Sequence, residues 1–176
     1  MRRIGLISDT HNGLPEVVYK HFKECDEIWH AGDFGSSQIA SQLNSFKPLK
    51  GVYGNIDGND IRSLYPEKLI WNCDDVKVFM THIGGHPVKY APGIKQVIRE
   101  NNVKLFICGH SHILRIQYDK ELECLYINPG AAGNQGWHKM RTIVRFTING
   151  TEIKDCEVIE LGRRESRQTT DRSRQT

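Results

Sequence analysis

The amino-acid sequence predicts a mixed α/β domain in which two β-sheets pack face to face and helices lie on the outside. Residues 4–53 follow the order strand, helix, strand, helix, strand, and residues 113–161 alternate apolar and polar side chains with the period of antiparallel strands. Together these regions contain more strands than one sheet needs. The length of 176 residues, 38% of them hydrophobic, suits one domain with a sizeable core.

In the N-terminal part, short apolar runs alternate with segments whose apolar residues recur every three or four positions. The runs predict strands and the segments predict helices, the first of them opened by Pro15, a residue that suits the first turn. The predicted elements are a strand over residues 4–8, a loop over 9–13, a helix from 15, a strand over 27–30, a helix over 36–45 and a strand over 50–53.

The remaining elements complete the second sheet and extend the first. Residues 69–72 and 76–81 flank a turn and predict a hairpin, residues 93–101 predict a short helix, and the fully apolar residues 105–108 predict a buried strand. Alternation then predicts strands over residues 113–118, 124–128, 142–148 and 152–161. The Asn149-Gly150 pair between the last two strands is a favoured hairpin turn.

The charge of the chain is concentrated at its C-terminus. Residues 163–176 hold five arginines against Glu165 and Asp171, which accounts for the formal net charge of +3 and leaves the body neutral. We therefore predict a domain over residues 1–162 and a disordered basic tail over 163–176, because the tail has no aromatic residue and little apolar surface to bury. The neutral body shows no nucleic-acid footprint, and contact of the tail with RNA stays open.

Composition also predicts the compartment. The mean hydropathy is −0.51, no apolar run approaches the roughly 18 residues of a membrane span, and the N-terminus is too brief for a signal peptide, so we expect no membrane contact and a cytoplasmic protein. The five cysteines are Cys25, Cys73, Cys108, Cys124 and Cys156. No two are close in sequence, which predicts reduced, mostly buried thiols and no thiolate zinc site.

Potential metal ligands follow five predicted strands. Because ligands gather at the carboxyl ends of strands in α/β sheets, these loops are expected to meet in one crevice. Each motif by itself has an ordinary explanation, such as a turn or a hydrogen-bonded histidine, but their common position favours a metal site. The residues are Asp9, His11, Asp33, Asn55, His82, His110 and His112.

The spacing and chemistry of these residues indicate more than one ion. Asp9 with His11, and His110 with His112, stand two positions apart, and in extended backbone such side chains point to the same side. Oxygen and imidazole donors without thiolate suit Mn, Fe, Co, Ni or Zn. Seven candidates are too many for one ion, whereas a carboxylate can bridge two ions roughly 3.5 to 4 Å apart.

The ordered motifs Asp-x-His, Gly-Asp, Gly-Asn, His and Gly-His-x-His resemble those of the calcineurin-like metallophosphoesterases over residues 4 to about 160. The length and the Asn-Pro-Gly turn at residues 128–130 are similar to those of small bacterial and archaeal phosphodiesterases. The resemblance implies a four-layer αββα sandwich of two mixed sheets flanked by helices, and two divalent ions, with Mn favoured over Fe, Ni, Co or Zn. One ion would bind Asp9, His11, Asp33 and His112, and the other Asp33, Asn55, His82 and His110.

The same resemblance implies hydrolysis of small or activated phosphodiesters by a hydroxide that bridges the ions. Asp33, Asn55 and His82 would be the catalytic residues, and Asn55 and His86 would contact the substrate. Two divalent ions and two aspartates leave a charge of about +2 facing the phosphoryl group. A basic protein surface is then unnecessary, and long nucleic-acid substrates are disfavoured because the body is neutral.

Position 56 departs from the family pattern. Ile56 stands where larger relatives have a histidine that assists the leaving group, and isoleucine cannot donate a proton. This predicts a preference for leaving groups that need no protonation. It also supports an alternative, a metal-binding but weakly active or inactive interaction scaffold like the phosphoesterase-like subunit of retromer. Further expectations are a homodimer formed through exposed strand edges, and Trp137 as a stacking or sheet-capping residue.

Overall fold

The computed structural model describes residues 1–165. Its elements run in the order β1 (Arg2–Ile7), α1 (Val17–Phe22), β2 (Glu27–His30), α2 (Ser37–Phe46), β3 (Leu49–Gly51), α3 (Asn59–Arg62), β4 (Lys68–Cys73), β5 (Val76–Thr81), β6 (Gly85–His86), β7 (Lys89–Tyr90), α4 (Ile94–Glu100), β8 (Leu105–Ile107), β9 (Arg115–Asp119), β10 (Cys124–Asn128), β11 (Met140–Asn149) and β12 (Glu152–Arg163).

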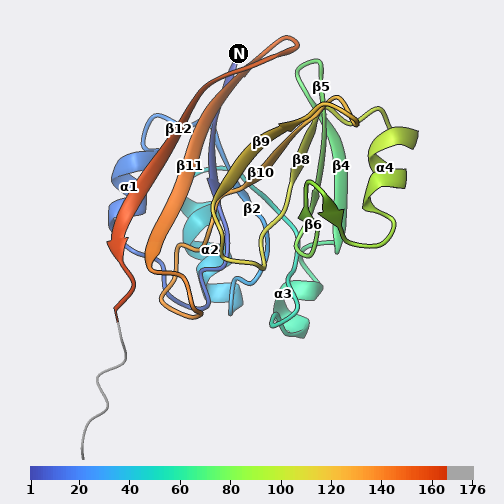
Figure 1. The fold of residues 1–176 in the computed structure, drawn as a ribbon. Coiled ribbons are helices and arrows are strands. Elements are labelled where there is room, and N and C mark those ends of the chain that lie inside the picture. Colours follow the sequence, from blue (N-terminus) through green and yellow to red (C-terminus); the bar gives the residue numbers. More distant parts are fainter. Residues whose placement is uncertain (166–176) are drawn as a thin grey trace, which may run out of the picture.

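Two mixed five-stranded sheets form the centre of the molecule (Figure 1). The first has the strand order β12-β11-β1-β2-β3, with β1, β2 and β3 parallel and the long β11–β12 hairpin antiparallel to them. The second has the order β4-β5-β8-β10-β9, with β5, β8 and β10 parallel between two antiparallel edge strands. The two mixed sheets predicted from the sequence are confirmed.

The sheets enclose the largest apolar core. Leu6 and Trp29 of the first sheet face Met80 and Ile107 of the second, and all four side chains are fully buried. Removal of such side chains from water stabilises the fold by about 1.5–3 kcal/mol each. Trp29 packs edge-on against Trp71 with the ring centroids 4.8 Å apart, which joins β2 of one sheet to β4 of the other.

Helices cover the outer face of each sheet. Phe22 of α1 and Leu43 of α2 pack on the first sheet, and Ile98 of α4 packs with Phe106 on the second. The helices thus lie on opposite outer faces of the sandwich (Figure 1). The arrangement is the four-layer αββα sandwich expected from the family resemblance.

The structure differs from the sequence-based expectations at the element ends and in two short elements. The strands of the terminal hairpin are longer than predicted, and β12 continues to Arg163, one residue into the predicted tail. Helix α3 and the β6–β7 hairpin were not predicted, because four and two residues are too few to show a period. Residues 166–176 of the predicted tail lie outside the described part.

Two compositional predictions are also tested by the structure. All five cysteines are free thiols; four are buried and Cys156 is exposed. Within residues 1–165, no helix is long and apolar enough to cross a membrane. Strands β12, β3, β4 and β9 end the two sheets, and a homodimer through these edges stays a prediction.

Candidate metal centre

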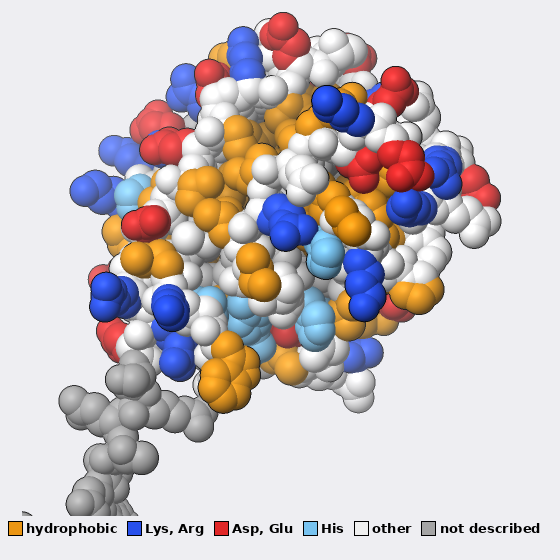
Figure 2. Space-filling view, viewed as in Figure 1, with side chains coloured by type: hydrophobic (Ala, Val, Ile, Leu, Met, Phe, Trp, Pro, Cys, Tyr) orange, Lys and Arg blue, Asp and Glu red, His pale blue; other side chains and the backbone are white. Residues whose placement is uncertain are grey.

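The polar strand-end loops converge at one end of the sandwich. Asp9 follows β1, Asp33 follows β2, His82 follows β5 and His110 follows β8, so the carboxyl ends of four parallel strands from both sheets supply the donors. In the space-filling view, histidine side chains gather in the lower half of the visible face (Figure 2). The loops after these four strands therefore lie together, and a single crevice formed by all five predicted loops stays a prediction.

The donors form two adjoining clusters. Asp9, His11 and His112 make the first, and Asp33, His82 and His110 the second; within each cluster the donor atoms lie within 4.8 Å of one another. In the first cluster, His112 Nε2 lies 3.1 Å from Asp9 Oδ1 and 3.3 Å from His11 Nε2. In the second, His82 Nε2 lies 3.1 Å from Asp33 Oδ2.

Asp33 connects the two clusters. Its Oδ2 atom is 3.1 Å from His82 Nε2 and also 3.6 Å from His11 Nε2 of the first cluster. In the same way, Asp9 Oδ1 is 3.8 Å from His82 Nε2 of the second cluster. A carboxylate between two donor sets is the arrangement that a bridging ligand requires.

Each aspartate commits one oxygen to the protein and leaves the other to the clusters. Asp9 Oδ2 accepts hydrogen bonds from the Ser8 hydroxyl at 2.6 Å and from the amide of His110 at 3.2 Å. Asp33 Oδ1 accepts from the amide of Ile56 at 3.0 Å. The chain therefore fixes both carboxylates with one oxygen directed at the histidines.

The remaining donor atoms fit a metal ion. Asp9 Oδ1 and His82 Nε2 are buried without a hydrogen-bond partner in the described chain, which is costly unless another group satisfies them. Bonds of about 2.0–2.2 Å from an ion to nitrogen and oxygen place neighbouring donors roughly 3 Å apart, close to the separations observed here. The donors are carboxylate oxygens and imidazole nitrogens, a set that suits divalent transition metals.

Left-handed backbone conformations aim these side chains. The φ angles are 53° at Asp9, 44° at His11, 58° at Asp33, 67° at His110 and 58° at His112. The premise that the paired residues lie in extended backbone is therefore wrong, although both pairs do reach the centre. Such conformations cost on the order of 1–3 kcal/mol each and cluster at functional sites.

Hydrogen bonds between the loops hold this backbone in place. Three amides of the loop after β1 donate hydrogen bonds to carbonyl groups of the loop after β2. These bonds are Asp9 N to Gly32 O (3.0 Å), His11 N to Asp33 O (3.0 Å) and Asn12 N to Phe34 O (2.9 Å). The amide of Gly133, in the loop after β10, donates to Asp9 O at 3.0 Å. Three loops are thus joined by main-chain hydrogen bonds of the kind that join strands.

Hydrogen bonds also determine which histidine nitrogen is free. The Nδ1–H of His82 donates to Ala31 O at 2.8 Å, which leaves Nε2 as the lone-pair donor. His138 donates from Nε2 to Gly133 O at 2.9 Å, so its Nδ1, 3.2 Å from His112 Nδ1, accepts from that atom. The Nε2 atom of His112 therefore carries the lone pair and faces Asp9.

Two of these supporting residues were not identified from the sequence. His138 belongs to an irregular loop in which only Trp137 stood out, and Trp137 proves to be 99% exposed, so it caps no sheet. His30 is fully buried at the end of β2, and its Nδ1 accepts the amide of Gly32 at 3.1 Å while Nε2–H donates to Thr10 Oγ1 at 3.0 Å. The sequence signal that could have identified His30 is its position at the end of a predicted strand, two residues before the Gly32-Asp33 motif.

The environment keeps both aspartates ionised. Burial raises the pKa of each carboxyl group, but nearby histidines outweigh it. The His11 and His112 side chains beside it hold the pKa of Asp9 well below its usual range, and the neighbouring His82 lowers the pKa of Asp33. The centre therefore presents two negative charges to a cation.

The surroundings of the second cluster also shift the pKa values of its two histidines. Burial lowers the pKa of His82, but the neighbouring carboxylates of Asp33 and Asp9 outweigh burial and raise it. The pKa of His110 is lowered by burial and by the neighbouring His82. A metal ion that binds His82 Nε2 therefore competes with a proton for that atom.

The loop after β3 places Asn55 beside the second cluster. Asn55 is exposed and lines a cavity that His82 also lines. The next residue, Ile56, has a side chain that is 48% exposed, and it is its amide that contacts Asp33. The role of Asn55 as a metal or substrate ligand stays a prediction.

Asp57 and Gly54 shape this loop. The buried Asp57 carboxylate accepts the amides of Gly54 at 2.8 Å and Gly35 at 2.9 Å, and so ties the loop after β3 to the loop after β2. A Cβ atom on Gly54 would lie 2.0 Å from Asp33 Oδ1. Glycine is therefore needed here to let the backbone approach the Asp33 carboxylate.

His86 lies outside both clusters. It is exposed in the β6–β7 hairpin, its Nδ1–H donates to Pro87 O at 2.7 Å, and it lines a cavity together with His110. A substrate contact from His86 stays a prediction.

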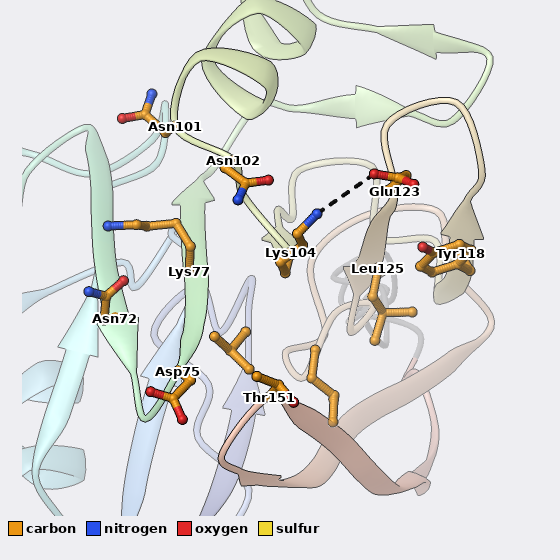
Figure 3. A pocket seen from close by; sticks show the side chains of 12 residues that line it. Asn72, Asp75, Lys77, Asn101, Asn102, Lys104, Tyr118, Glu123, Leu125 and Thr151 are labelled. Carbon is orange, nitrogen blue, oxygen red and sulfur yellow. Dashed lines mark ion pairs between the residues drawn. The ribbon is translucent and has the colours of Figure 1, made fainter.

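A cavity of about 780 Å³ lies at the opposite end of the sandwich (Figure 3). It is lined by the β4–β5 turn, the end of α4 and the starts of β8 and β10. Its ionisable residues include Lys104, whose ammonium group lies 3.9 Å from the exposed Glu123 carboxylate. Cavity size therefore does not identify the candidate centre in this protein; the donor set does.

Fold and site together define a class: a two-sheet sandwich protein with an aspartate and histidine donor set at the carboxyl ends of its strands. The chain belongs to the calcineurin-like phosphoesterase superfamily, whose domain model matches residues 1–151.

Three similar proteins represent this family and fold. A "Probable metallophosphoesterase" of Methanothermobacter thermautotrophicus is 30% identical over 174 residues, which cover 90% of this chain and 92% of that protein. A phosphodiesterase of Methanocaldococcus jannaschii is 27% identical over 144 residues, covering 73% of this chain and 82% of that protein. The fold is shared with Vps29 of Entamoeba histolytica in complex with Zn²⁺, at a TM-score of 0.69 and 16% identity, with 90% of this chain and 98% of that chain covered.

Proposed function

We propose that this protein is a metal-dependent phosphodiesterase that hydrolyses small or activated phosphodiesters at a site for two divalent ions. The observation that carries the proposal is the pair of donor clusters linked by Asp33. Names of the archaeal relatives support the reaction class.

The chain's residues divide between two ions. Asp9, His11 and His112 would hold one ion and His82 and His110 the other, and Asp33 Oδ2, which faces histidines of both clusters, would bridge them. Asn55 would complete the second set from the loop after β3. Mn is the favoured metal, and Fe, Co, Ni and Zn suit the same donors.

Bound ions would act as Lewis acids on the phosphoryl group and lower the pKa of a water molecule. The chain provides the charge balance for this role. Asp9 and Asp33 together contribute −2 against the +4 of two divalent ions, and the histidines add no negative charge. The centre therefore stays positive toward a phosphodiester, in line with a site that needs no basic surface around it.

The protein groups orient the reaction. The Ile56 amide and His82 hold the Asp33 carboxylate, and Ala31 O holds the His82 ring. Asn55, at the exposed edge, would contact a phosphoryl oxygen. The ester oxygen of the leaving group then departs without a proton from position 56, because an isoleucine side chain has none to give.

A comparison of leaving groups tests this last point. With Mn²⁺ added, turnover of bis(p-nitrophenyl) phosphate should exceed turnover of dialkyl phosphates by more than the intrinsic difference in reactivity, since general acid help is worth about 10²- to 10⁴-fold. An Ile56→His variant should narrow the gap. If the ratio of aryl to alkyl diester turnover were the same in the wild type and in Ile56→His, position 56 would not determine the leaving-group preference.

Metal dependence tests the proposal as a whole. Hydrolysis of bis(p-nitrophenyl) phosphate should appear when Mn²⁺ is added to metal-free protein and disappear in His11→Ala and Asp33→Ala. His21→Ala, which changes a half-buried histidine on α1, is the matched control and should retain activity. Activity that is independent of added metal, or retained in Asp33→Ala, would contradict the proposal.

The alternative is a metal-binding scaffold of the same fold with weak or no turnover. The likeness to Vps29 supports it at the level of fold, and Ile56 supports it at the level of the site. Against it stand the two clusters of aspartate and histidine donors. Stoichiometric metal without hydrolysis of any diester would favour the scaffold.

A further inference from the structure

Two cavities flank the second donor cluster. One, of about 370 Å³, is lined by His82 and Asn55, and the other, of about 410 Å³, is lined by His110. The rings of His82 and His110 have centroids 5.3 Å apart. Ile83 lines both cavities and thus stands between them. A phosphorus atom at this cluster would have one cavity on either side.

The cavity beside His110 has tyrosine walls whose hydroxyl groups are already used. We call it the tyrosine cavity. Tyr90 OH donates to Asp119 Oδ2 at 2.8 Å, and Tyr126 OH donates to Gly85 O at 2.7 Å. The half-buried Tyr90 ring therefore offers carbon surface to the cavity, the Tyr126 ring lies buried in its wall at 2% exposure, and Ile83 and Ile113 add aliphatic surface. Ile113 is 62% exposed, so this surface is open to a ligand.

Cations stand among these apolar walls. Lys89 and Arg115 line the same cavity, and neither lies within 4.0 Å of a carboxylate in the described chain. His86 also lines this cavity; its Nδ1–H is donated to Pro87 O, so its Nε2 atom can accept a hydrogen bond. A group that fits this cavity is flat and apolar on its faces and carries acceptor atoms at its edge.

The cavity beside His82 has a different character, and we call it the charged cavity. Arg62, Glu67 and Lys68 line it with Asn55. The Arg62 guanidinium lies over the Tyr53 ring at 4.4 Å and donates to Asp57 O at 2.7 Å, so the wall is both charged and held in place. A polar substituent suits this side.

We propose that the tyrosine cavity binds an aromatic ester arm of the phosphodiester, while the other arm extends toward the charged cavity. This rests on the proposed function, because it places phosphorus at the Asp33, His82 and His110 cluster. It assigns the substrate class as diesters with one arm that bears a nucleobase-like or aryl ring. A monoester or dialkyl diester would leave the tyrosine cavity unfilled.

Binding of two matched phosphodiesters tests the assignment. Dissociation constants of diphenyl phosphate and dimethyl phosphate are measured by isothermal titration calorimetry with the Mn²⁺-loaded full chain. Burial of a phenyl ring predicts diphenyl phosphate to bind about tenfold more tightly or better. Ile113→Asp should reduce this ratio toward one, because it places a charge on the exposed apolar wall.

Control variants separate the two cavities. Ile70→Asp changes an exposed isoleucine on β4 that lines neither cavity, and it should preserve the wild-type ratio. An added negative charge weakens the binding of both ligands, because both carry the phosphate. The ratio of the two dissociation constants is therefore compared, and not either constant alone. A ratio near one in the wild type, or a ratio lost in Lys68→Ala but kept in Ile113→Asp, would overturn the assignment.

Hydrolysis of bis(p-nitrophenyl) phosphate in the same samples distinguishes the two proposals. No hydrolysis with an intact binding ratio would overturn the phosphodiesterase and leave the aromatic cavity standing. Hydrolysis with a ratio near one would overturn the cavity alone. To separate nucleobases from simple aryl groups, thymidine 5′-methyl phosphate is compared with dimethyl phosphate, and equal affinities would restrict the cavity to aryl arms.

Discussion

The two ends of the sandwich differ in how they treat charge. At the end with the candidate metal centre, two aspartates and His82 are buried, and five of the candidate ligands have left-handed backbone. At the opposite end, around the cavity of Figure 3, Lys77, Lys104 and Glu123 are half-buried or exposed, and only a 3.9 Å ion pair joins two of them. The charged groups at the candidate metal centre are buried, which costs free energy, whereas those at the opposite end are solvated by water.

This contrast shows that buried donor groups, and not cavity volume, indicate the functional site. The opposite end has the larger cavity, about 780 Å³ against about 410 Å³ beside His110. It lacks convergent buried donors among residues 1–165. A burial cost for ionised groups and a strain cost for the backbone persist where the rest of the fold enforces them.

The largest difference is expected from aspartate substitutions. Asp33→Asn should reduce bound metal from two ions to at most one and lower diester hydrolysis by about 10³-fold or more, an effect at least as large as loss of one key electrostatic group. Asp75→Asn, in the β4–β5 turn of the opposite end, should alter neither. Metal content is measured by atomic emission after dialysis. Equal metal content in both variants would erase the contrast between the ends.

A smaller effect is expected from the residue that supports His112. His138→Ala removes the acceptor for His112 Nδ1–H and should weaken metal binding by about 10- to 100-fold, as loss of other outer partners of metal ligands does. His138→Gln, which can still accept that proton and donate to Gly133 O, should recover part of the loss. Trp137→Ala is the neighbouring control. A metal dissociation constant unchanged in His138→Ala would show that His112 needs no partner.

The third prediction concerns pH and the buried His30 of the metal-free protein. Burial lowers the pKa of His30 from 6.5 to about 3, so between these values the unfolded chain binds a proton that the folded chain does not. The contribution of His30 to stability is fully present above pH 6.5 and is lost as the pH falls. The expected slope is up to about 1.4 kcal/mol per pH unit.

Urea unfolding between pH 7 and pH 4.5 measures this slope. His30→Gln should unfold more easily at pH 7 and show a shallower decline toward acid than the wild type. His21→Gln, on α1 outside the centre, should keep the wild-type slope. If His30→Gln retained the full slope, the acid sensitivity would have to come from other groups.

Much of the fold follows from local patterns, and the exceptions have physical reasons. Strands β8, β10 and β11 are buried over most of their length, and their positions agree with the prediction to within two residues. Helix α3 has four residues, of which only Ile61 is buried, and so leaves no periodic signal. Short elements are defined by their neighbours and not by their own sequence.

The site divides in the same way. Placement of Asp9, Asp33 and His82 at strand ends follows from the topology of parallel strands, which a sequence pattern can predict. The left-handed turns could not be predicted, because aspartate and histidine give no local signal that distinguishes them from extended residues. His138 lies 26 positions from its partner His112, and only the tertiary fold brings them together.

Main-chain hydrogen bonds join the loops after β1, β2 and β10 without using a side-chain donor atom of either cluster. The centre is therefore preorganised, and an incoming cation has no disordered segment to fold. The melting temperature should then rise with metal-ion concentration as the affinity of the folded protein for the ion predicts. Binding does not have to offset the entropy lost in ordering a loop. Amide hydrogens of Asp9, His11 and Gly133 should exchange slowly with solvent in the metal-free protein as well as in the loaded one.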